Sequence, residues 1–488
     1  MKKHLKLISF VLALSMLVAA LAGCGGKTPE TTTEAKTEAK ENNTVENIET
    51  EAEYKPDIEQ KNYNDEFYFW IMGDSNPPDL YWVKESQNDA MSDAVYERQE
   101  KVRKHLGVEI IGSDTESEDR YVAPFQTAVK NKDGSVDLLI THVYYGIEGF
   151  VTGNYITDLN DIPQLDLEAP YWKLQFMEDI GINGHFYLGF GDLNILYTHV
   201  ITFNKELLAK YEDAMTEDIY SMVENYHWTL DQMISLASLA YIDTNSDGKT
   251  DDDWFGIAGY QSVPFIGFMQ ASNINIVDLD DSGNYVLGFY TDKTKQKMSD
   301  LVDKISNLAK SDYACFKKDY TYPGMVSGRT LMEVSGTPWL TGYLASDVDF
   351  GIVPFPMYDE NQKDVGYRSL QWGGYLCVPS YLADETKTAE TIEMMAYYSA
   401  DVANVYYEKL LGKQVADAPQ DRKMLQIVWD SVCSDFGQTY FTVFYQTNVL
   451  YVFPSVTSVN ASEGLASYVA SRQNTVNRNI KKFMAKVK

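Results

Sequence analysis

The feature that most restricts the fold of this chain is a regular alternation of strand and helix patterns. Short apolar runs typical of strands alternate with helical repeats, in the order 66–72, 89–106, 108–111, 121–130 and 136–141. Consecutive parallel strands need a crossover, usually a helix, so this order predicts a parallel, doubly wound sheet. Ligands of such sheets bind beyond the carboxyl ends of the strands, where Asp74, Tyr144 and Tyr145 follow in the sequence.

The rest of the chain has the same α/β character. Gly107 follows the first helical repeat at the position where a left-handed C-cap is expected. Further strands are expected at 198–204, 349–355 and 374–379, and further helices at 291–310, 386–403 and 464–488. A length of 488 residues corresponds to two or three structural units of ordinary size.

Charge and composition restrict the binding partners. Acidic residues outnumber basic ones by 71 to 41, which gives a formal net charge of −30. A nucleic acid would be repelled, and no basic stripe offsets this charge. A cation, a neutral polar ligand or a carbohydrate is compatible with it. Aromatic residues make up 13% of the chain, and they either fill a large core or line a cleft that grips ring-shaped ligands.

The first 24 residues have the organisation of an export signal. Lysines precede the apolar stretch 7–22, which is short for a membrane span and leads into Leu21-Ala22-Gly23-Cys24. This ending resembles the lipobox of bacterial lipoproteins. It implies lipidation of Cys24 and firm attachment to the extracellular face of the cell membrane through acyl chains. An ordinary signal peptide with a chance cysteine is the alternative. Residues 25–62 are polar and lack apolar periodicity, which predicts a disordered tether.

Three further cysteines are present, Cys315, Cys377 and Cys433. None forms a CxxC pair and no HExxH motif occurs, so metal or redox sites of these types are not expected. An odd number leaves at least one free thiol, and we expect no structural disulfide. Cys377 lies in an apolar strand pattern, which predicts a buried position.

Several short motifs follow one another over residues 63–488, at 136–140, 183–187, 203–208, 228–231, 243–248 and 350–356. In this order they resemble the extracellular solute-binding proteins of ABC importers, in the branch that includes maltose-binding protein. The resemblance implies an α/β fold of the type II periplasmic-binding-protein class, in which two lobes with doubly wound sheets are joined by a hinge. It places the first lobe at about 63–200 and 351–405, and the second at about 205–350 and 406–488.

The resemblance also implies a function. Such a protein captures a carbohydrate, in particular an oligosaccharide, by hinge closure and delivers it to an ABC permease, as a monomer without catalysis and without a required cofactor. A peptide-binding or ligand-sensing lipoprotein is the alternative, because its binding lobes would have the same sequence features. An anchored glycoside hydrolase is a further alternative, although chance pairs of carboxylates are inevitable among 71 acidic residues, and neither GxSxG nor SxxK occurs.

A sugar site needs flat rings for the C–H faces of the sugar, and carboxylates or amides for its hydroxyl groups. By the resemblance, Trp339 in a Gly-Thr-Pro-Trp segment is a stacking platform, and Trp372 lies just before a strand near the hinge. The predicted ligand-binding residues are Asp74, Tyr144, Tyr145, Asp192, Trp339 and Trp372. The alternative is a core or hinge position for the aromatic residues and a turn for the aspartates.

An acidic loop is a second candidate site. Oxygen-bearing side chains at alternate positions before Gly248 resemble an EF-hand or dockerin calcium loop. The candidate ligands are Asp243, Asn245, Asp247, Lys249 through its backbone carbonyl, Asp251 and Asp253. Trp254 stands where a bidentate glutamate would close the shell, so Asp251 or Asp253 would have to replace it. Structural calcium is one hypothesis, and an Asx-rich turn is the other.

Overall fold

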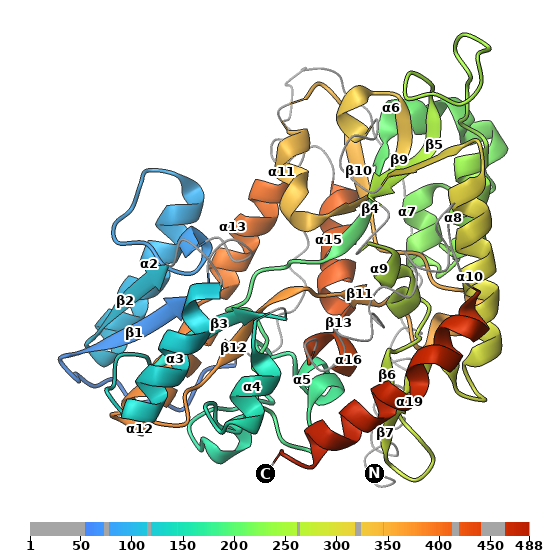
Figure 1. Cartoon of the computed structure of the whole chain (residues 1–488). Helices are drawn as coiled ribbons and strands as arrows, with labels where there is room; N and C mark the ends of the chain where they lie inside the picture. Colours follow the sequence, from blue (N-terminus) through green and yellow to red (C-terminus); the bar gives the residue numbers. More distant parts are fainter. Residues whose placement is uncertain are drawn as a thin grey trace, which may run out of the picture. The chain divides into compact units, whose positions relative to one another are not determined.

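Two mixed β-sheets form the framework of the chain in the computed structural model (Figure 1). The described residues are 54–72, 78–114, 119–143, 145–260, 264–317, 324–344, 346–411, 419–440 and 464–487. The first sheet contains, in spatial order, β12 (Gly373–Cys377), β3 (Leu138–His142), β1 (Asp65–Ile71) and β2 (Val108–Asp114). The second contains β10 (Phe350–Val353), β4 (His199–Asn204), β9 (Thr330–Gly336), β5 (Phe255–Tyr260) and β8 (Ala314–Lys317).

The first sheet is built around β1. This strand pairs in parallel with both β2 and β3, so the doubly wound arrangement predicted from the alternation of patterns is confirmed. Phe67, Phe69 and Ile71 are fully buried, whereas Tyr68 and Trp70 between them are half-buried, as the two faces of a pleated strand require. β12 adds an antiparallel edge next to β3, from a much later part of the chain.

Helices connect the strands and cover the sheets. They are α2 (Ala90–Leu106), α3 (Asp119–Asn131), α4 (Ile147–Thr152), α5 (Leu174–Ile180), α6 (Lys205–Leu208), α7 (Ile219–Glu224), α8 (Leu230–Ser238), α9 (Pro264–Ala271), α10 (Lys295–Lys310), α11 (Leu340–Tyr343), α12 (Glu385–Tyr397), α13 (Ala400–Leu411), α15 (Pro419–Asp430), α16 (Phe436–Thr439) and α19 (Leu465–Met484). Gly107 ends α2 with φ +66°, and a Cβ atom there would lie 1.9 Å from Asn62 Oδ1. The predicted C-cap is therefore confirmed.

In the second sheet β5 pairs in parallel with β8 and β9, and β4 is antiparallel to both β9 and β10. The sequence-based division assigns residues from 351 onwards to the first lobe, but β10 belongs to the second sheet. Its partner β4 lies far away in the sequence, and no local pattern indicates such a pairing. The chain therefore returns to the first sheet only after β10.

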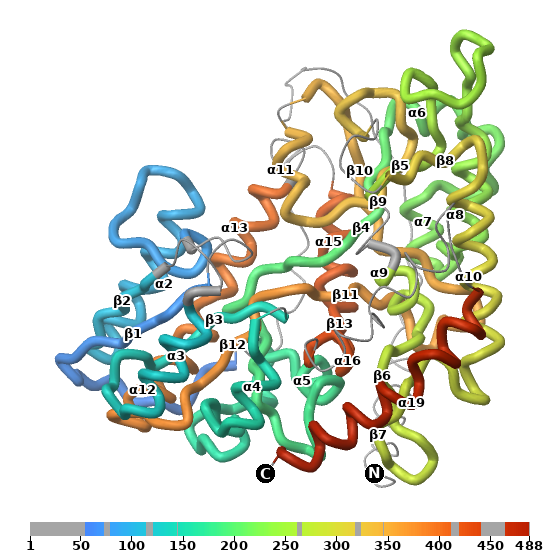
Figure 2. The backbone as a smooth tube through the Cα atoms, viewed as in Figure 1, coloured from blue at the N-terminus to red at the C-terminus, as the bar shows by residue number. Residues whose placement is uncertain are grey.

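Within the described residues the chain crosses between the two sheets at 189–198 and at 354–372, as the backbone trace in Figure 2 shows. The packing of α13 and α15 implies a third crossing. Residues 189–198 lead from the edge of β12 into β4. Residues 354–372 lead back from β10 to β12, and they contain β11 (Ser369–Leu370), which pairs with β13 (Val432–Cys433). α13 packs on α2 and leads into α15, which contacts β10. These crossings join two lobes, each with its own sheet, as the type II fold requires.

The segment before β1 is part of the ordered body. The backbone amides of Lys61 and Tyr63 donate to carbonyl oxygens at the end of α2, at 3.0 and 2.8 Å. Their side chains both reach Glu390 of α12, at 2.5 Å from Lys61 Nζ and 2.7 Å from the Tyr63 hydroxyl. The prediction of a disordered tether is therefore wrong for residues 54–62. Polar contacts hold this stretch in place. A segment held in this way shows no periodic repeat of apolar residues, so the sequence gives no sign that it is ordered.

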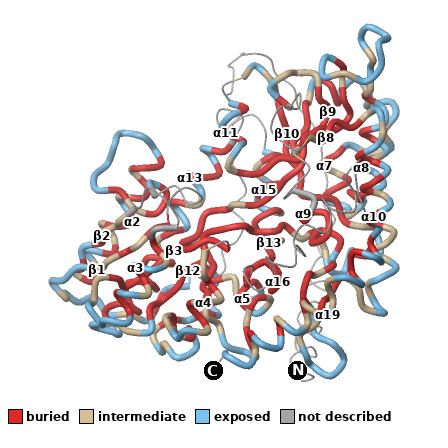
Figure 3. The backbone as a smooth tube through the Cα atoms, viewed as in Figure 1, coloured by how far each residue is buried: buried red, intermediate tan, exposed pale blue. Residues whose placement is uncertain are grey.

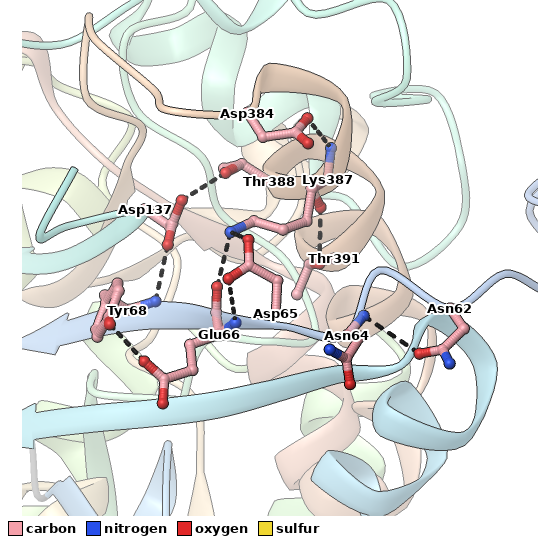
Figure 4. A network of polar contacts seen from close by, with 10 residues as sticks. All are labelled: Asn62, Asn64, Asp65, Glu66, Tyr68, Asp137, Asp384, Lys387, Thr388 and Thr391. Atoms are coloured by element: carbon pink, nitrogen blue, oxygen red, sulfur yellow. Dashed lines mark hydrogen bonds and ion pairs between the residues drawn. The ribbon is translucent and has the colours of Figure 1, made fainter.

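A buried polar network fixes α12 to the amino ends of β1 and β3 (Figure 4). The carboxylate of Asp137 accepts hydrogen bonds from the Tyr68 amide at 2.8 Å and from the Thr388 hydroxyl at 2.6 Å. Lys387 Nζ donates to Asp65 Oδ2 at 2.8 Å and to the carbonyl oxygen of the next residue at 2.7 Å. Asp137 and Lys387 are almost fully buried, so these contacts are shielded from water.

Buried residues follow both sheets, and exposed residues lie on the outer loops and helix faces (Figure 3). Cys377 in β12 is buried, as predicted, and Cys315 and Cys433 are also buried free thiols. Within the described ranges, no helix combines the length and the apolar character needed to cross a membrane.

We expect Asp137→Ala to reduce the free energy of unfolding by about 1–3 kcal/mol, because it leaves the Tyr68 amide and the Thr388 hydroxyl without an acceptor. Urea denaturation measures this loss. Asp133→Ala is the matched control, since Asp133 is exposed and its side chain contacts only Ser135. Equal losses for the two variants would contradict the role of the α12 network.

Candidate functional site

Each sheet has one point where the direction of winding reverses. In the first sheet it lies between β1 and β3, and in the second between β5 and β9. Ligands of doubly wound sheets bind at the carboxyl ends of the strands at this point. β3 ends at His142, shortly before Tyr145, and β9 ends at Gly336, shortly before Trp339. Two predicted site residues therefore follow the expected strand ends, one from each lobe.

Two groups of rings lie at these strand ends and are linked through the backbone. Together we call them the aromatic cluster, which consists of His142, Tyr145, Tyr197, His199, Trp339, Phe355 and Trp372. His142 lies 5.9 Å from Tyr145 and 6.4 Å from Tyr197, measured between ring centroids. His199 lies 6.1 Å from Trp339 and 5.6 Å from Trp372. The two halves meet where the Trp372 amide donates to the Tyr197 carbonyl at 2.9 Å.

Trp339 presents the most accessible ring of this cluster, with 39% of the residue exposed. A Cβ atom on Gly336 would lie 2.8 Å from the Trp339 ring. The indole can therefore occupy this position only because residue 336 has no side chain. Thr337, between them, is buried and donates its hydroxyl to the Leu196 carbonyl at 2.7 Å. The loop that holds Trp339 is thus fastened to the first crossing segment.

Trp372 lies in a different environment. Only 3% of the residue is exposed, and its indole N–H donates to His199 Nδ1 at 2.8 Å. Burial lowers the pKa of His199 to about 3, so the ring is neutral, with its proton on Nε2. An enclosed indole has little surface for stacking on a ligand. This favours the hinge alternative for Trp372, whose predicted contact with ligand stays a prediction.

A buried glutamine connects the two crossing segments beside this cluster. Gln371 Oε1 accepts from the Tyr197 amide at 3.0 Å. Its Nε2 donates to the carbonyl oxygens of Ile195 at 3.0 Å and Gly373 at 2.8 Å. The side chain is fully buried, and all of these partners are backbone groups. Gln371 therefore fixes the spacing of the strands from which the cluster residues project.

The other predicted ligand residues have different outcomes. Asp74 and Tyr144 lie outside the described residues. Asp192 is half-buried in a narrow cavity of about 10 Å³, together with Tyr407 of α13 and Trp429 of α15. Burial raises the pKa of Asp192 to about 6. None of the residues that line this cavity belongs to the aromatic cluster, so the structure does not bring Asp192 to the cluster.

The acidic loop is held by hydrogen bonds of its own. Asp243 accepts from the amides of Ser246 at 2.7 Å and Gly248 at 3.1 Å. Asp253 is buried and accepts from the amides of Thr244 at 3.0 Å and Thr250 at 2.7 Å. Asn245 and Asp247 bond to each other, Lys249 donates to the Ser311 carbonyl, and Asp251 pairs with Lys317.

Within the ranges described, no three His, Cys, Asp or Glu side chains lie close enough together to hold a metal ion. The hydrogen bonds of the acidic loop have the form of the Asx-rich turn. Calcium binding by this loop stays a prediction.

Sequence reasoning missed several cluster residues, namely His142, Tyr197, His199 and Phe355. His142 ends a strand pattern, so it lies where the winding rule directs attention. His199 begins a strand pattern, and it lies beside the end of β9 only because β4 and β9 are antiparallel. Nothing local distinguishes Tyr197 or Phe355 from other aromatic residues. Their role depends on which segments cross between the sheets.

No family model and no curated protein sequence matches this chain. Solved structures do match it. The GacH receptor of Streptomyces glaucescens, studied unliganded and with acarbose, is 17% identical with a TM-score of 0.50, over 87% of this chain and 98% of that one. At this identity the likeness is one of fold. The chain has the two-lobe fold of ABC solute-binding proteins.

Two further structures with this fold are similar. An ABC substrate-binding protein from Listeria monocytogenes, in complex with cycloalternan, is 12% identical with a TM-score of 0.52, over 86% of this chain and 99% of that one. An ABC transporter solute-binding protein from Thermotoga lettingae, bound with α-D-tagatose, is 14% identical with a TM-score of 0.51, over 85% and 100%. All three are receptors or binding proteins, and none is an enzyme.

The buried histidines predict a pH dependence of stability. Burial lowers the pKa of both His142 and His199 to about 3. In the unfolded chain a histidine titrates near pH 6.5, so below this pH the unfolded state binds more protons. Stability is therefore complete above about pH 6.5 and falls as the pH decreases towards 3, by up to about 1.4 kcal/mol per pH unit for each histidine.

We expect His199→Asn to remove one histidine's share of this slope. Urea denaturation between about pH 7 and pH 5 measures the free energy of unfolding for the wild type and the variant. The two curves should converge as the pH falls. Parallel curves would contradict the assignment of His199 as a buried neutral ring.

Proposed function

We propose that this chain is a membrane-anchored lipoprotein that captures a carbohydrate, in particular an oligosaccharide, by hinge closure and delivers it to an ABC permease. The observation that carries the proposal is the accessible Trp339 ring, which follows the strand end where a ligand of this fold is expected. A flat indole stacks on the C–H face of a sugar ring, and an oligosaccharide offers several such faces.

The chemistry of the aromatic cluster supports a neutral ligand. His142 and His199 are uncharged because burial lowers the pKa of each. The other members are Tyr, Trp and Phe, so the cluster provides apolar surface and neutral hydrogen-bonding groups. Such a lining suits a polyhydroxylated ring better than an ionic ligand.

The three crossings support binding by closure. A ligand that contacts rings from both lobes stabilises the conformation in which these rings lie close together, so it shifts the population towards the closed form. Trp339 and Tyr145 come from different lobes. The similar structures from Streptomyces, Listeria and Thermotoga, described with acarbose, cycloalternan and tagatose, support the same class of ligand.

We expect Trp339→Ala to weaken sugar binding by about 1–3 kcal/mol, or roughly 5- to 150-fold in Kd, because the stacking surface is lost. Isothermal titration calorimetry with acarbose, cycloalternan and D-tagatose identifies a sugar that binds the wild type and measures the change. Trp254→Ala is the matched control, since Trp254 precedes β5 at the amino edge of the same sheet. Unchanged affinity in Trp339→Ala, or an equal loss in both variants, would remove Trp339 from the site.

Attachment to the membrane is the second part of the proposal. The lipobox-like ending at Cys24 supports lipidation of this residue. We expect Cys24→Ala to move the protein from the membrane fraction to the medium while its affinity for sugar stays unchanged. Fractionation of cells that produce each form, followed by immunoblotting, measures this. A variant that stays in the membrane fraction would contradict anchoring through Cys24.

A further inference from the structure

A carboxylate that sequence reasoning did not single out lies close to Tyr145. Glu148 is in the first turn of α4, which begins directly after the loop that follows β3. On this turn Ile147 and Phe150 are buried, and Phe150 packs on Phe125 at 4.8 Å between ring centroids. Tyr145 and Glu148 are only half-buried. Tyr145 precedes the N-cap Gly146 by one residue, and Glu148 is the second residue of the helix, so the two residues are close in the sequence.

One oxygen of the Glu148 carboxylate, Oε2, is enclosed and has no hydrogen-bond partner among the residues that the structure describes. Burial raises the pKa of Glu148, and only the backbone amides of Glu148 and Gly149 act against this rise. No basic side chain contributes. An enclosed acceptor without a partner costs free energy, and such groups are concentrated where a ligand uses them.

Glu148 lies in the region of the first lobe where a ligand of this fold is expected. It follows β3, whose carboxyl end borders the winding reversal of the first sheet, and it comes three residues after Tyr145 of the aromatic cluster in the sequence. A sugar that stacks on an indole still presents hydroxyl groups at the edge of its ring. A carboxylate has two acceptor oxygens, so it can take hydrogen bonds from two adjacent hydroxyl groups at once.

We propose that Glu148 is a ligand-binding residue of the first lobe, which accepts hydrogen bonds from sugar hydroxyl groups while Trp339 provides the stacking surface of the second lobe. The inference rests on the proposed function. It also restricts the ligand: a carboxylate at this place accepts neutral or amino sugars and repels acidic sugars. Loss of Glu148 therefore reduces affinity for neutral sugars and weakens the discrimination against acidic ones.

The test compares Glu148→Gln with Glu178→Gln, in which an exposed glutamate of α5 is changed in the same way. Calorimetry uses whichever of acarbose, cycloalternan and D-tagatose binds the wild type, and D-glucuronate serves as the acidic probe. We expect Glu148→Gln to raise the Kd for the neutral sugar about ten- to hundredfold and Glu178→Gln to leave it unchanged. The ligand-free melting temperature of Glu148→Gln should stay the same or rise, because a buried charge is removed.

Two outcomes would overturn the inference. One is a Glu148→Gln protein that binds the neutral sugar within twofold of the wild type, including the case in which only its melting temperature falls. The other is a Glu148→Asp protein, which keeps the charge, that loses as much affinity as Glu148→Gln. If Trp339→Ala loses affinity while Glu148→Gln does not, the proposed function stands and only this inference fails. If the wild type binds none of the sugars, both fail.

Discussion

The backbone of residues 195–198 is held against that of residues 370–373 by the buried side chains of Gln371 and Thr198, together with direct backbone bonds. These stretches belong to two different crossings between the sheets. Because Gln371 is fully buried and bonds to three backbone groups, breaking its contacts would leave several polar groups without partners. These contacts therefore fix the position of the two crossing segments relative to each other.

The arrangement of the rings follows from this constraint. Trp372 is the next residue after Gln371, and its indole reaches back to His199 at the start of β4. His199 in turn lies between Trp372 and Trp339, and it stays neutral because it is buried. A site built in this way offers rings and neutral groups at the junction of the lobes. Flat rings and neutral hydrogen-bonding groups are what the proposed sugar ligand would contact.

The sequence predicts local order well and long-range order poorly. The parallel pairing of β1, β2 and β3 follows from the alternation of strand and helix patterns, and the C-cap at Gly107 follows from residue type. Two predictions fail for the same reason. One places β10 in the first lobe, and the other extends the disordered tether over residues 54–62. In both places the deciding partners lie far away in the sequence, in β4 and in Glu390, and neither leaves a periodic pattern.

The candidate site shows the same division. Tyr145 follows a strand end that the sequence predicts, and the resemblance indicates Trp339, whereas Asp192 lines a cavity with Tyr407 of α13 and Trp429 of α15, which come from much later parts of the chain. The sequence does not indicate Glu148 as a site residue, because a single glutamate in a short helix is typical of a solvent-exposed position. Its burial without a partner becomes visible only after α4 has packed through Ile147 and Phe150.

Thermal melting of the purified protein tests whether the chain binds a carbohydrate between its lobes. Acarbose, cycloalternan and D-tagatose form the sugar panel, and short neutral peptides form the comparison. A ligand at about 100 times its Kd adds about 2.7 kcal/mol to the free energy of unfolding, which raises the melting temperature measurably. We expect the melting temperature to rise with at least one sugar and to stay unchanged with the peptides. A rise with the peptides alone, or no rise with any sugar, would contradict carbohydrate binding.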